Sequence, residues 1–319
     1  MLTISYFSYK GGSGRSSLIY NTIPFLVNDL NASEEHPIIV VDLDADSAGL
    51  SYLLTEDKIK EDKQTDFLTT NMLIDEKINL FSKYLFRNAG STNFKNFELY
   101  RMFLPVGAEF GLNHLQHDRS VLFVPVKPDK TISKFDGPAN NKIGDFLSVC
   151  ENYGASAVVF DMPAGGQIIG GEAFQQSDKI LVCMRITKQH RMGTLDYLKE
   201  KMAGVSAEFI PVFNVVPQEK ILIDDKEFSL EEVRRNLKQE LESLKLRSEQ
   251  LGASCKFNFK MLDYEYYGIP EVKRFKFIEG ILYAIKNKNK NKDKSLSEDE
   301  EKAYKSYEYL ANIIAENAE

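Results

Sequence analysis

The residues SYKGGSGRSS (8–17) form a glycine- and serine-rich stretch of the kind that binds phosphate. Glycine lets the backbone fold tightly, so that successive N–H groups can point at one phosphate group. An apolar run precedes the stretch and a helical pattern follows it, and the N-terminus of a helix adds a favourable positive end. This order of elements predicts a nucleotide phosphate site. The alternative is a glycine- and serine-rich turn that holds no ligand.

Two cations accompany the loop, Lys10 before the first glycine and Arg15 after the last. A phosphate loop usually has lysine at the position of Arg15. Arginine keeps the charge and can grip phosphate through two hydrogen bonds, but its planar fork is larger and more rigid. The hydroxyl of Ser16 is placed to ligate Mg²⁺, and that of Ser17 to approach the α-phosphate. The residues predicted to bind the nucleotide here are Gly11, Gly12, Ser13, Gly14, Arg15, Ser16 and Ser17.

Acidic residues follow two apolar runs further along the chain. VVDLDADSAGL (40–50) carries Asp42, Asp44 and Asp46, and VVFDMPAGG (158–166) carries Asp161. Doubly wound folds bind ligands where strands end, and carboxylates gathered there need a cation or water among them. We therefore expect Asp44 and Asp161 to accompany Mg²⁺, while Asp46 suits the N-cap of a helix. The Pro-Ala-Gly-Gly after Asp161 predicts a loop that senses the γ-phosphate.

A polar residue also ends the run AEFIPVFNVV (207–216). Asn214 carries both a donor and an acceptor, so its side chain can read the edge of adenine. An asparagine in a turn at the end of a strand is an equally good interpretation of the spacing.

These motifs resemble those of the ParA/MinD class of P-loop ATPases, which has a deviant Walker A box. KGGSGRSS matches that box, with Lys10 on its signature lysine, and the two acidic runs resemble its switch I box and its Walker B and switch II box. Tyr9, Arg15 and Gly49-Leu50 resemble a subgroup with SYKGGVGRT, in which arginine is a family variant. The matching motifs cover roughly 1–55 and 118–217, and Ser13 departs from a usual valine.

The resemblance implies ATP and Mg²⁺ as cofactors, a homodimer that forms on ATP binding, and a partner protein that stimulates hydrolysis. It implies that Lys10 crosses to the partner's phosphates, that Arg15 is the phosphate cation of its own chain, and that Asp44 positions the attacking water. The region of Ile269 and Pro270 would close the base pocket. By resemblance, the catalytic residues are Lys10, Arg15 and Asp44, the metal-associated residues are Ser16, Asp44 and Asp161, and the adenine contacts are Asn214 and Pro270.

Alternating apolar and helical patterns must position these residues. Near-continuous hydrophobicity at 2–8, 37–44, 120–126, 155–163, 178–184 and 207–216 predicts buried parallel strands, with helices at 15–31, 139–152, 190–203 and 229–251. That order predicts a doubly wound α/β fold of the P-loop NTPase, SIMIBI-like type, with helices on both faces of a mostly parallel sheet. We expect a single domain over 1–319, with an insertion at 56–119 and a helical C-terminal extension at 286–319.

Two of the helical patterns leave a question open. Pro24 falls inside the first and should end or kink it near the third turn. Leucines recur every seven residues in 229–251, which predicts either an apolar face packed on the sheet or a seam for a partner helix. We expect the last helix to dock on its own domain.

Composition limits the function further. The net charge of −7 does not indicate nucleic acid as a general partner, although it leaves a local DNA contact open, for example at the lysine-rich run 286–294. The N-terminus lacks the pattern of a signal peptide, and the sequence has no apolar run long enough for a membrane span, so we expect a cytoplasmic protein. Three widely spaced cysteines give no disulfide framework.

Three other function classes compete with the ATPase. A nucleotide-binding scaffold with little hydrolysis fits the same motifs if Arg15 marks lost catalysis. A bacterial tyrosine kinase usually has an arginine where this chain has Asp46, and an iron–sulfur reductase of the nitrogenase type needs cluster cysteines that Cys150 and Cys183 do not match.

Overall fold

The computed structural model describes most of the chain. The described residues are 1–44, 47–54, 102–110, 112, 119–126, 142–165, 168–202, 204–219, 222–223, 226–227, 229–250, 255–276, 280–288 and 296–316. Most of the predicted insertion 56–119, most of the lysine-rich run 286–294, and Asp46 therefore lie outside the described residues.

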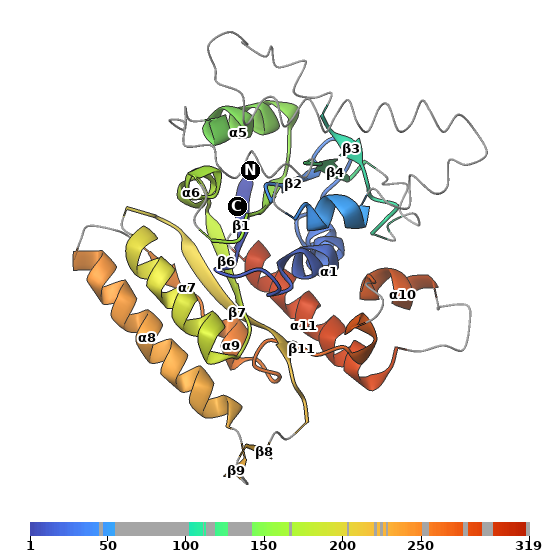
Figure 1. Cartoon of the computed structure of the whole chain (residues 1–319). Helices are drawn as coiled ribbons and strands as arrows, with labels where there is room; N and C mark the ends of the chain where they lie inside the picture. Colours follow the sequence, from blue (N-terminus) through green and yellow to red (C-terminus); the bar gives the residue numbers. More distant parts are fainter. Residues whose placement is uncertain are drawn as a thin grey trace.

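A mostly parallel sheet forms the centre of the molecule (Figure 1). Within the described residues it has nine strands, in the order β10–β7–β6–β1–β5–β2–β4–β3, with β11 also beside β7. All pairs are parallel except β3 with β4. The strands are β1 (Leu2–Phe7), β2 (Ile38–Asp42), β3 (Leu104–Pro105), β4 (Val121–Val124), β5 (Ala157–Asp161), β6 (Lys179–Met184), β7 (Glu208–Val216), β10 (Lys256–Phe257) and β11 (Ile269–Pro270). A small hairpin, β8 (Leu222–Ile223) with β9 (Lys226–Glu227), lies apart from the sheet. Each apolar run predicted as a strand is one, and the predicted doubly wound α/β fold is confirmed.

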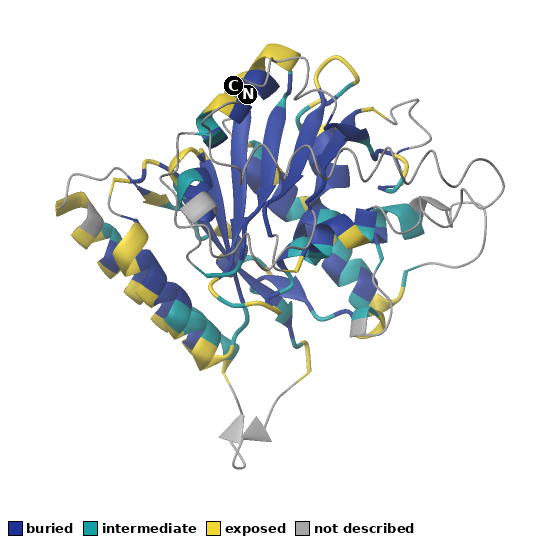
Figure 2. Cartoon of the chain, turned by 45° about the horizontal axis from the view of Figure 1, so that its top comes forward, coloured by how far each residue is buried: buried dark blue, intermediate teal, exposed yellow. Residues whose placement is uncertain are grey.

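Helices cover both faces of the sheet, which is why β1, β2, β4, β5 and β6 are buried throughout (Figure 2). One face packs against α5, α6, α7 and α8, and the other against α1, α10 and α11. The helices are α1 (Arg15–Asp29), α5 (Lys142–Tyr153), α6 (Ile168–Gln175), α7 (Lys188–Lys201), α8 (Leu230–Gln250), α9 (Lys260–Asp263), α10 (Leu282–Lys288) and α11 (Glu298–Ala315). None of the described helices is long and apolar enough to cross a membrane.

Helix α1 continues through Pro24 to Asp29, so Pro24 does not end the helix, and the predicted alternative of a kink at this residue stays a prediction. Pro24 is buried with its neighbours Phe25 and Leu26 in the core beneath the sheet. Burial of this apolar face outweighs the hydrogen bond that proline cannot donate.

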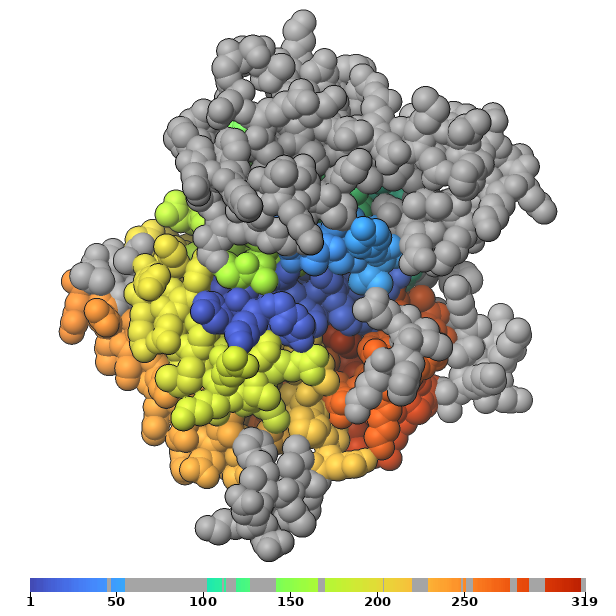
Figure 3. Space-filling model, in the orientation of Figure 1, coloured from blue at the N-terminus to red at the C-terminus, as the bar shows by residue number. Residues whose placement is uncertain are grey.

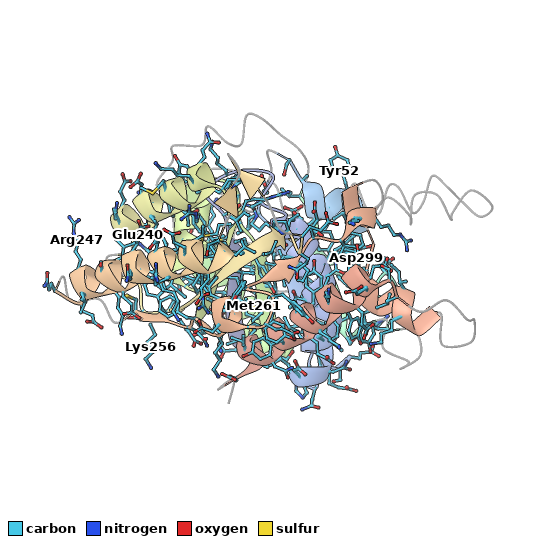
Figure 4. All side chains as sticks on the ribbon, turned by 90° about the horizontal axis from the view of Figure 1, so that it is seen from below. Tyr52, Glu240, Arg247, Lys256, Met261 and Asp299 are labelled. Atoms are coloured by element: carbon cyan, nitrogen blue, oxygen red, sulfur yellow. The ribbon has the colours of Figure 1, made fainter. Side chains whose placement is uncertain are left out.

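Helix α8 packs on its own domain, as one of the two interpretations of its leucine repeat predicted. Val233, Leu237, Leu241 and Leu244 are buried in the same apolar cluster as the sheet. The helix starts beside Ser229, whose Oγ accepts a hydrogen bond from the backbone N–H of Glu232 at 3.2 Å. Seen from below, Arg247 projects into solvent from the far end of α8 (Figure 4).

Helix α11 docks along α1, as predicted for the last helix. Its N-terminus is held by a capping box between Ser297 and Glu300. Tyr307, Leu310 and Ile314 on one face are buried against the apolar cluster that contains α1. These contacts tie α11 to the helix that follows the glycine-rich loop.

Candidate functional site

The glycine-rich loop connects β1 to α1 at the carboxyl ends of the central strands. Gly12 and Gly14 have positive φ angles of 75° and 80°, which glycine adopts without strain, and Gly14 is the N-cap of α1. A Cβ atom at Gly14 would lie 2.5 Å from Nδ2 of Asn214. Glycine is therefore required at this position by both the backbone and its neighbour.

Gly14→Ala should lower the free energy of unfolding of the nucleotide-free protein by about 1–3 kcal/mol, because alanine strains the left-handed backbone and overlaps the amide of Asn214. Gly11→Ala is the matched control, since a Cβ at Gly11 would meet no described atom within 4 Å. We expect that control to stay within about 0.5 kcal/mol of the wild type in urea unfolding. Equal losses from the two substitutions would contradict the assigned role of Gly14.

The guanidinium of Arg15 binds two of the predicted acidic residues. Its Nε donates to Asp161 Oδ1 at 2.6 Å, its Nη2 to Asp44 Oδ2 at 2.7 Å, and its Nη1 to Ser8 Oγ at 3.0 Å. Arg15 is 6% exposed, and a buried guanidinium requires such partners because it has lost its water. The loop arginine, Asp44 and Asp161 thus meet in one buried cluster.

The opposite charges in this cluster stabilise one another in their ionised forms. Burial by itself lowers the pKa of Arg15, but the charges of Asp161 and Asp44 raise it above its ordinary value. Burial raises the pKa of Asp161, although the charge of Arg15 and a hydrogen bond from Ser16 oppose that rise. Removing the cation would therefore leave carboxyl groups buried without their counter-charge.

The residues predicted to accompany Mg²⁺ lie together. Ser16 Oγ donates to Asp161 Oδ2 at 2.7 Å, and Ser47 Oγ donates to Asp44 Oδ2 at 2.9 Å. Hard hydroxyl and carboxylate oxygens suit Mg²⁺, which commonly binds one or two protein groups and completes its shell with phosphate and water. The described residues contain no group of three His, Cys, Asp or Glu side chains that could hold a metal ion. The set fits a metal shared with a nucleotide.

Asp42 supports this arrangement without facing the loop. Its Oδ1 accepts the backbone N–H of Asp44 at 2.9 Å, and its Oδ2 accepts the N–H and the hydroxyl of Ser51 at 2.9 and 2.8 Å. Burial, together with the charge of Asp161, raises the pKa of Asp42 to about 8. Asp42 therefore ties the end of β2 to the helical residues 49–54 and fixes the backbone that carries Asp44.

Asn214 holds the loop from the other side. Its Nδ2 donates to the carbonyl oxygens of Ser13 and Gly14 at 2.9 and 3.0 Å, and its Oδ1 accepts the N–H of Val215 at 3.0 Å. The side chain is buried, so in this structure its polar atoms serve the protein. Pro270 lies close by, because β11 pairs with β7 at Asn214 and Val216. Adenine contact by Asn214 and Pro270 stays a prediction.

Lys10 is placed quite differently from Arg15. It is partly exposed, and its side chain has no ion pair or hydrogen bond with the described residues. Burial lowers the pKa of His190, and the charges of Arg185 and Lys10 lower it further, which places these cations near that histidine. Arg185 also contacts the loop directly, because its Nε donates a hydrogen bond to the carbonyl oxygen of Gly12 at 3.1 Å.

Sequence interpretation missed Arg185 and His190. The signal was present as a basic run, RITKQHR (185–191), directly after the strand 178–184. In the space-filling view the N-terminal residues, in blue, reach the surface beside the yellow-green residues of the α7 region (Figure 3).

The hydroxyl of Ser17, predicted to approach the α-phosphate, is directed toward Tyr307 in α11. Burial raises the pKa of Tyr307, and a hydrogen bond from Ser17 opposes that rise.

The sequence matches no protein-family model and no curated protein. Its fold is nevertheless similar to solved structures. The cell division ATPase MinD of Pyrococcus furiosus is 18% identical, with a TM-score of 0.52, and the match covers 97% of this chain and 96% of that one. The ParA of pNOB8 bound to nonspecific DNA is 12% identical, with a TM-score of 0.52, covering 99% and 96%. MinD in the MinC:MinD complex of Aquifex aeolicus is 14% identical, with a TM-score of 0.50, covering 98% and 95%. At such identities these likenesses establish the fold, which is the one that the sequence motifs predicted.

Proposed function

We propose that this chain, which has the fold of the MinD and ParA ATPases, is a Mg²⁺-dependent ATP hydrolase that works as a dimerisation switch. One observation carries the proposal. The loop at 9–14 and the cluster of Arg15, Ser16, Asp44 and Asp161 meet at the carboxyl edge of the sheet, while Lys10 stands outside that cluster. This distribution gives one cation to the site of its own chain and leaves one for a second copy.

Some groups of this site bind the nucleotide and others take part in its hydrolysis. Backbone N–H groups of the loop hold the phosphates, and Arg15 leaves its carboxylates to contact them. A Mg²⁺ ion bound with ATP would supply positive charge against the phosphates. Ser16 and Asp161 would hold the metal and its water shell, and Asp44 would orient the attacking water. Hydrolysis is slow until a partner completes or tightens this arrangement.

The output of the switch is contact with another macromolecule. The ParA of pNOB8 is bound to nonspecific DNA and the MinD of Aquifex aeolicus to MinC, so both classes of partner occur on this fold. The net charge of −7 favours a protein partner over DNA for this chain. A cytoplasmic location belongs to the same proposal.

A specific observation favours a second candidate, a scaffold that binds nucleotide and scarcely hydrolyses it. Arg15 engages both Asp44 and Asp161, the acids that hydrolysis needs, through a fork that a lysine does not have. If those contacts persist with nucleotide bound, the water and the metal shell lose their ligands. Tight ATP binding in calorimetry with no phosphate release, even with a partner protein present, would select the scaffold.

Sedimentation velocity tests the leading proposal. Mg²⁺-ATP should shift the wild-type protein from monomer to dimer, and ADP should leave it a monomer, because only the γ-phosphate gives Lys10 of a second copy its target. EDTA should reverse the shift. An unchanged mass with saturating Mg²⁺-ATP, when calorimetry shows that ATP is bound, would rule out the dimerisation switch.

A further inference from the structure

The strand that leads into the loop runs along one face of α7. The ring of Phe7 stacks on the ring of Tyr197, with centroids 4.5 Å apart and an interplanar angle of 25°. Two residues later, the ring of Tyr9 lies against Gly193, which is four residues before Tyr197. Residues four apart on a helix share a face. The two contacts therefore lie on one face of α7, the first made by the last residue of β1 and the second by the loop that follows it.

Gly193 is the residue that allows the ring of Tyr9 to lie against α7. A Cβ atom at this position would lie 2.3 Å from both Cδ1 and Cε1 of Tyr9. Real Cβ atoms do not approach a ring so closely, so any larger residue must move Tyr9. Tyr9 is 38% exposed, so its side chain can move outward without opening the core.

The contact fixes the residue directly before Lys10. The β6–α7 segment holds the loop at a second point, where Arg185 Nε donates to the carbonyl oxygen of Gly12 at 3.1 Å. These two supports bracket Lys10, whose side chain has no polar partner among the described residues. Within the described part of the chain, the position of Lys10 is therefore set by its neighbours in the sequence.

We propose that Tyr9, seated on α7 at Gly193, is a positioning residue that aims Lys10 at the phosphates of a second copy. This inference rests on the proposed function, in which Lys10 crosses between two chains. It adds that α7 is the support for that lysine, so that any displacement of α7 changes where Lys10 points. The glycine of α7 and the tyrosine of the loop act as one unit.

The nucleotide-free protein gives the first test, and it does not depend on dimerisation. Because the charge of Lys10 contributes to the lowered pKa of His190, a displaced Lys10 lets that pKa rise. Gly193→Ala and Tyr9→Ala should each raise the pKa of His190 in an NMR titration, with the resonance assigned by its loss in His190→Gln. Tyr9→Phe, which keeps the ring on Gly193, should leave the pKa of His190 unchanged.

Gly171→Ala is the matched control, since Gly171 also lies in a helix, α6, and a Cβ there would meet no described atom within 4 Å. It should leave the pKa of His190 and the ATP-dependent association unchanged. The same pKa in Gly193→Ala and Gly171→Ala would overturn the inference.

The second test follows self-association on Mg²⁺-ATP. Gly193→Ala and Tyr9→Ala should each weaken the dimer by about tenfold or more, as expected when a charged contact across an interface is misplaced. The double variant should be no weaker than either single one, because both changes remove one contact. Losses that simply add would overturn the inference. A wild-type protein that fails to associate would overturn the proposed function, and the pKa of His190 would still decide whether Tyr9 places Lys10.

Discussion

Replacement of Arg15 with alanine is expected to lower the free energy of unfolding of the nucleotide-free protein by about 3–5 kcal/mol, since one partner of a buried ion pair is removed. Asp44 and Asp161 would stay buried with no cation beside them, and Ser8 would lose a donor. The arginine of this loop is thus a structural residue before any nucleotide arrives. Urea unfolding of the nucleotide-free protein at neutral pH measures the effect.

Arg119→Ala supplies the comparison, because it removes the same side chain from an exposed pair. Nη1 of Arg119 lies 2.9 Å from Oε1 of Glu34, but the two side chains are 65% and 58% exposed. Such exposed pairs contribute about 0–1 kcal/mol to the free energy of unfolding. Arg15→Lys should fall between the two, since an ammonium group keeps the charge without the three-way fork. If Arg15→Ala unfolds at the same urea concentration as Arg119→Ala, the buried cluster does not stabilise the fold as inferred.

Lys10→Ala is expected to abolish the ATP-dependent dimer while leaving stability within about 0.5 kcal/mol of the wild type. The side chain makes no polar contact with the described residues, so its removal costs the monomer little. In the proposed dimer it faces the phosphates of the other chain, where loss of a charge contact weakens association strongly. Sedimentation velocity with saturating Mg²⁺-ATP measures the dimer, and urea unfolding measures the stability.

Lys199→Ala controls for the loss of one positive charge, because Lys199 pairs only with the exposed Asp196 among the described residues. Its ATP-dependent dimer should match that of the wild type. Calorimetry should also show that Lys10→Ala still binds ATP, since Arg15 and the loop remain. A full dimer from Lys10→Ala would contradict the assignment of Lys10 to the second chain.

The sequence was sufficient for the six longer strands of the sheet, while the functional roles of the site residues stay predictions. Near-continuous apolar runs identified β1, β2, β4, β5, β6 and β7, because a strand buried on both faces has few other compositions. The acids Asp44 and Asp161 were predicted to lie together because parallel strands end at one edge. In the structure both acids bind the guanidinium of Arg15, and Asp42, two residues before Asp44, is paired in register with Asp161 across β2 and β5.

The contacts between these residues could not be predicted. That Arg15 binds Asp44 and Asp161 depends on strand order, which places residues far apart in sequence at one edge. The two-residue strands β3, β10 and β11 are too short to show a period, and β3 lies inside the predicted insertion. Pro24 does not end α1, because burial of its apolar neighbours outweighs the low helical propensity of proline. The role of Gly193 could not be predicted either, because it depends on its contact with the ring of Tyr9, a residue distant in the sequence.

The packing of α11 on α1 has a consequence for synthesis of the protein. The two helices lie at opposite ends of the sequence, yet the rings of Phe25 and Tyr304 are 4.9 Å apart and Tyr307 is buried in the same cluster as α1. The apolar flank of α1 therefore stays uncovered until α11 has left the ribosome. At about 5–20 residues per second that interval lasts on the order of 15 s or more, during which the flank is open to chaperones and to aggregation. The helix that follows the glycine-rich loop is thus made long before the helix that covers it.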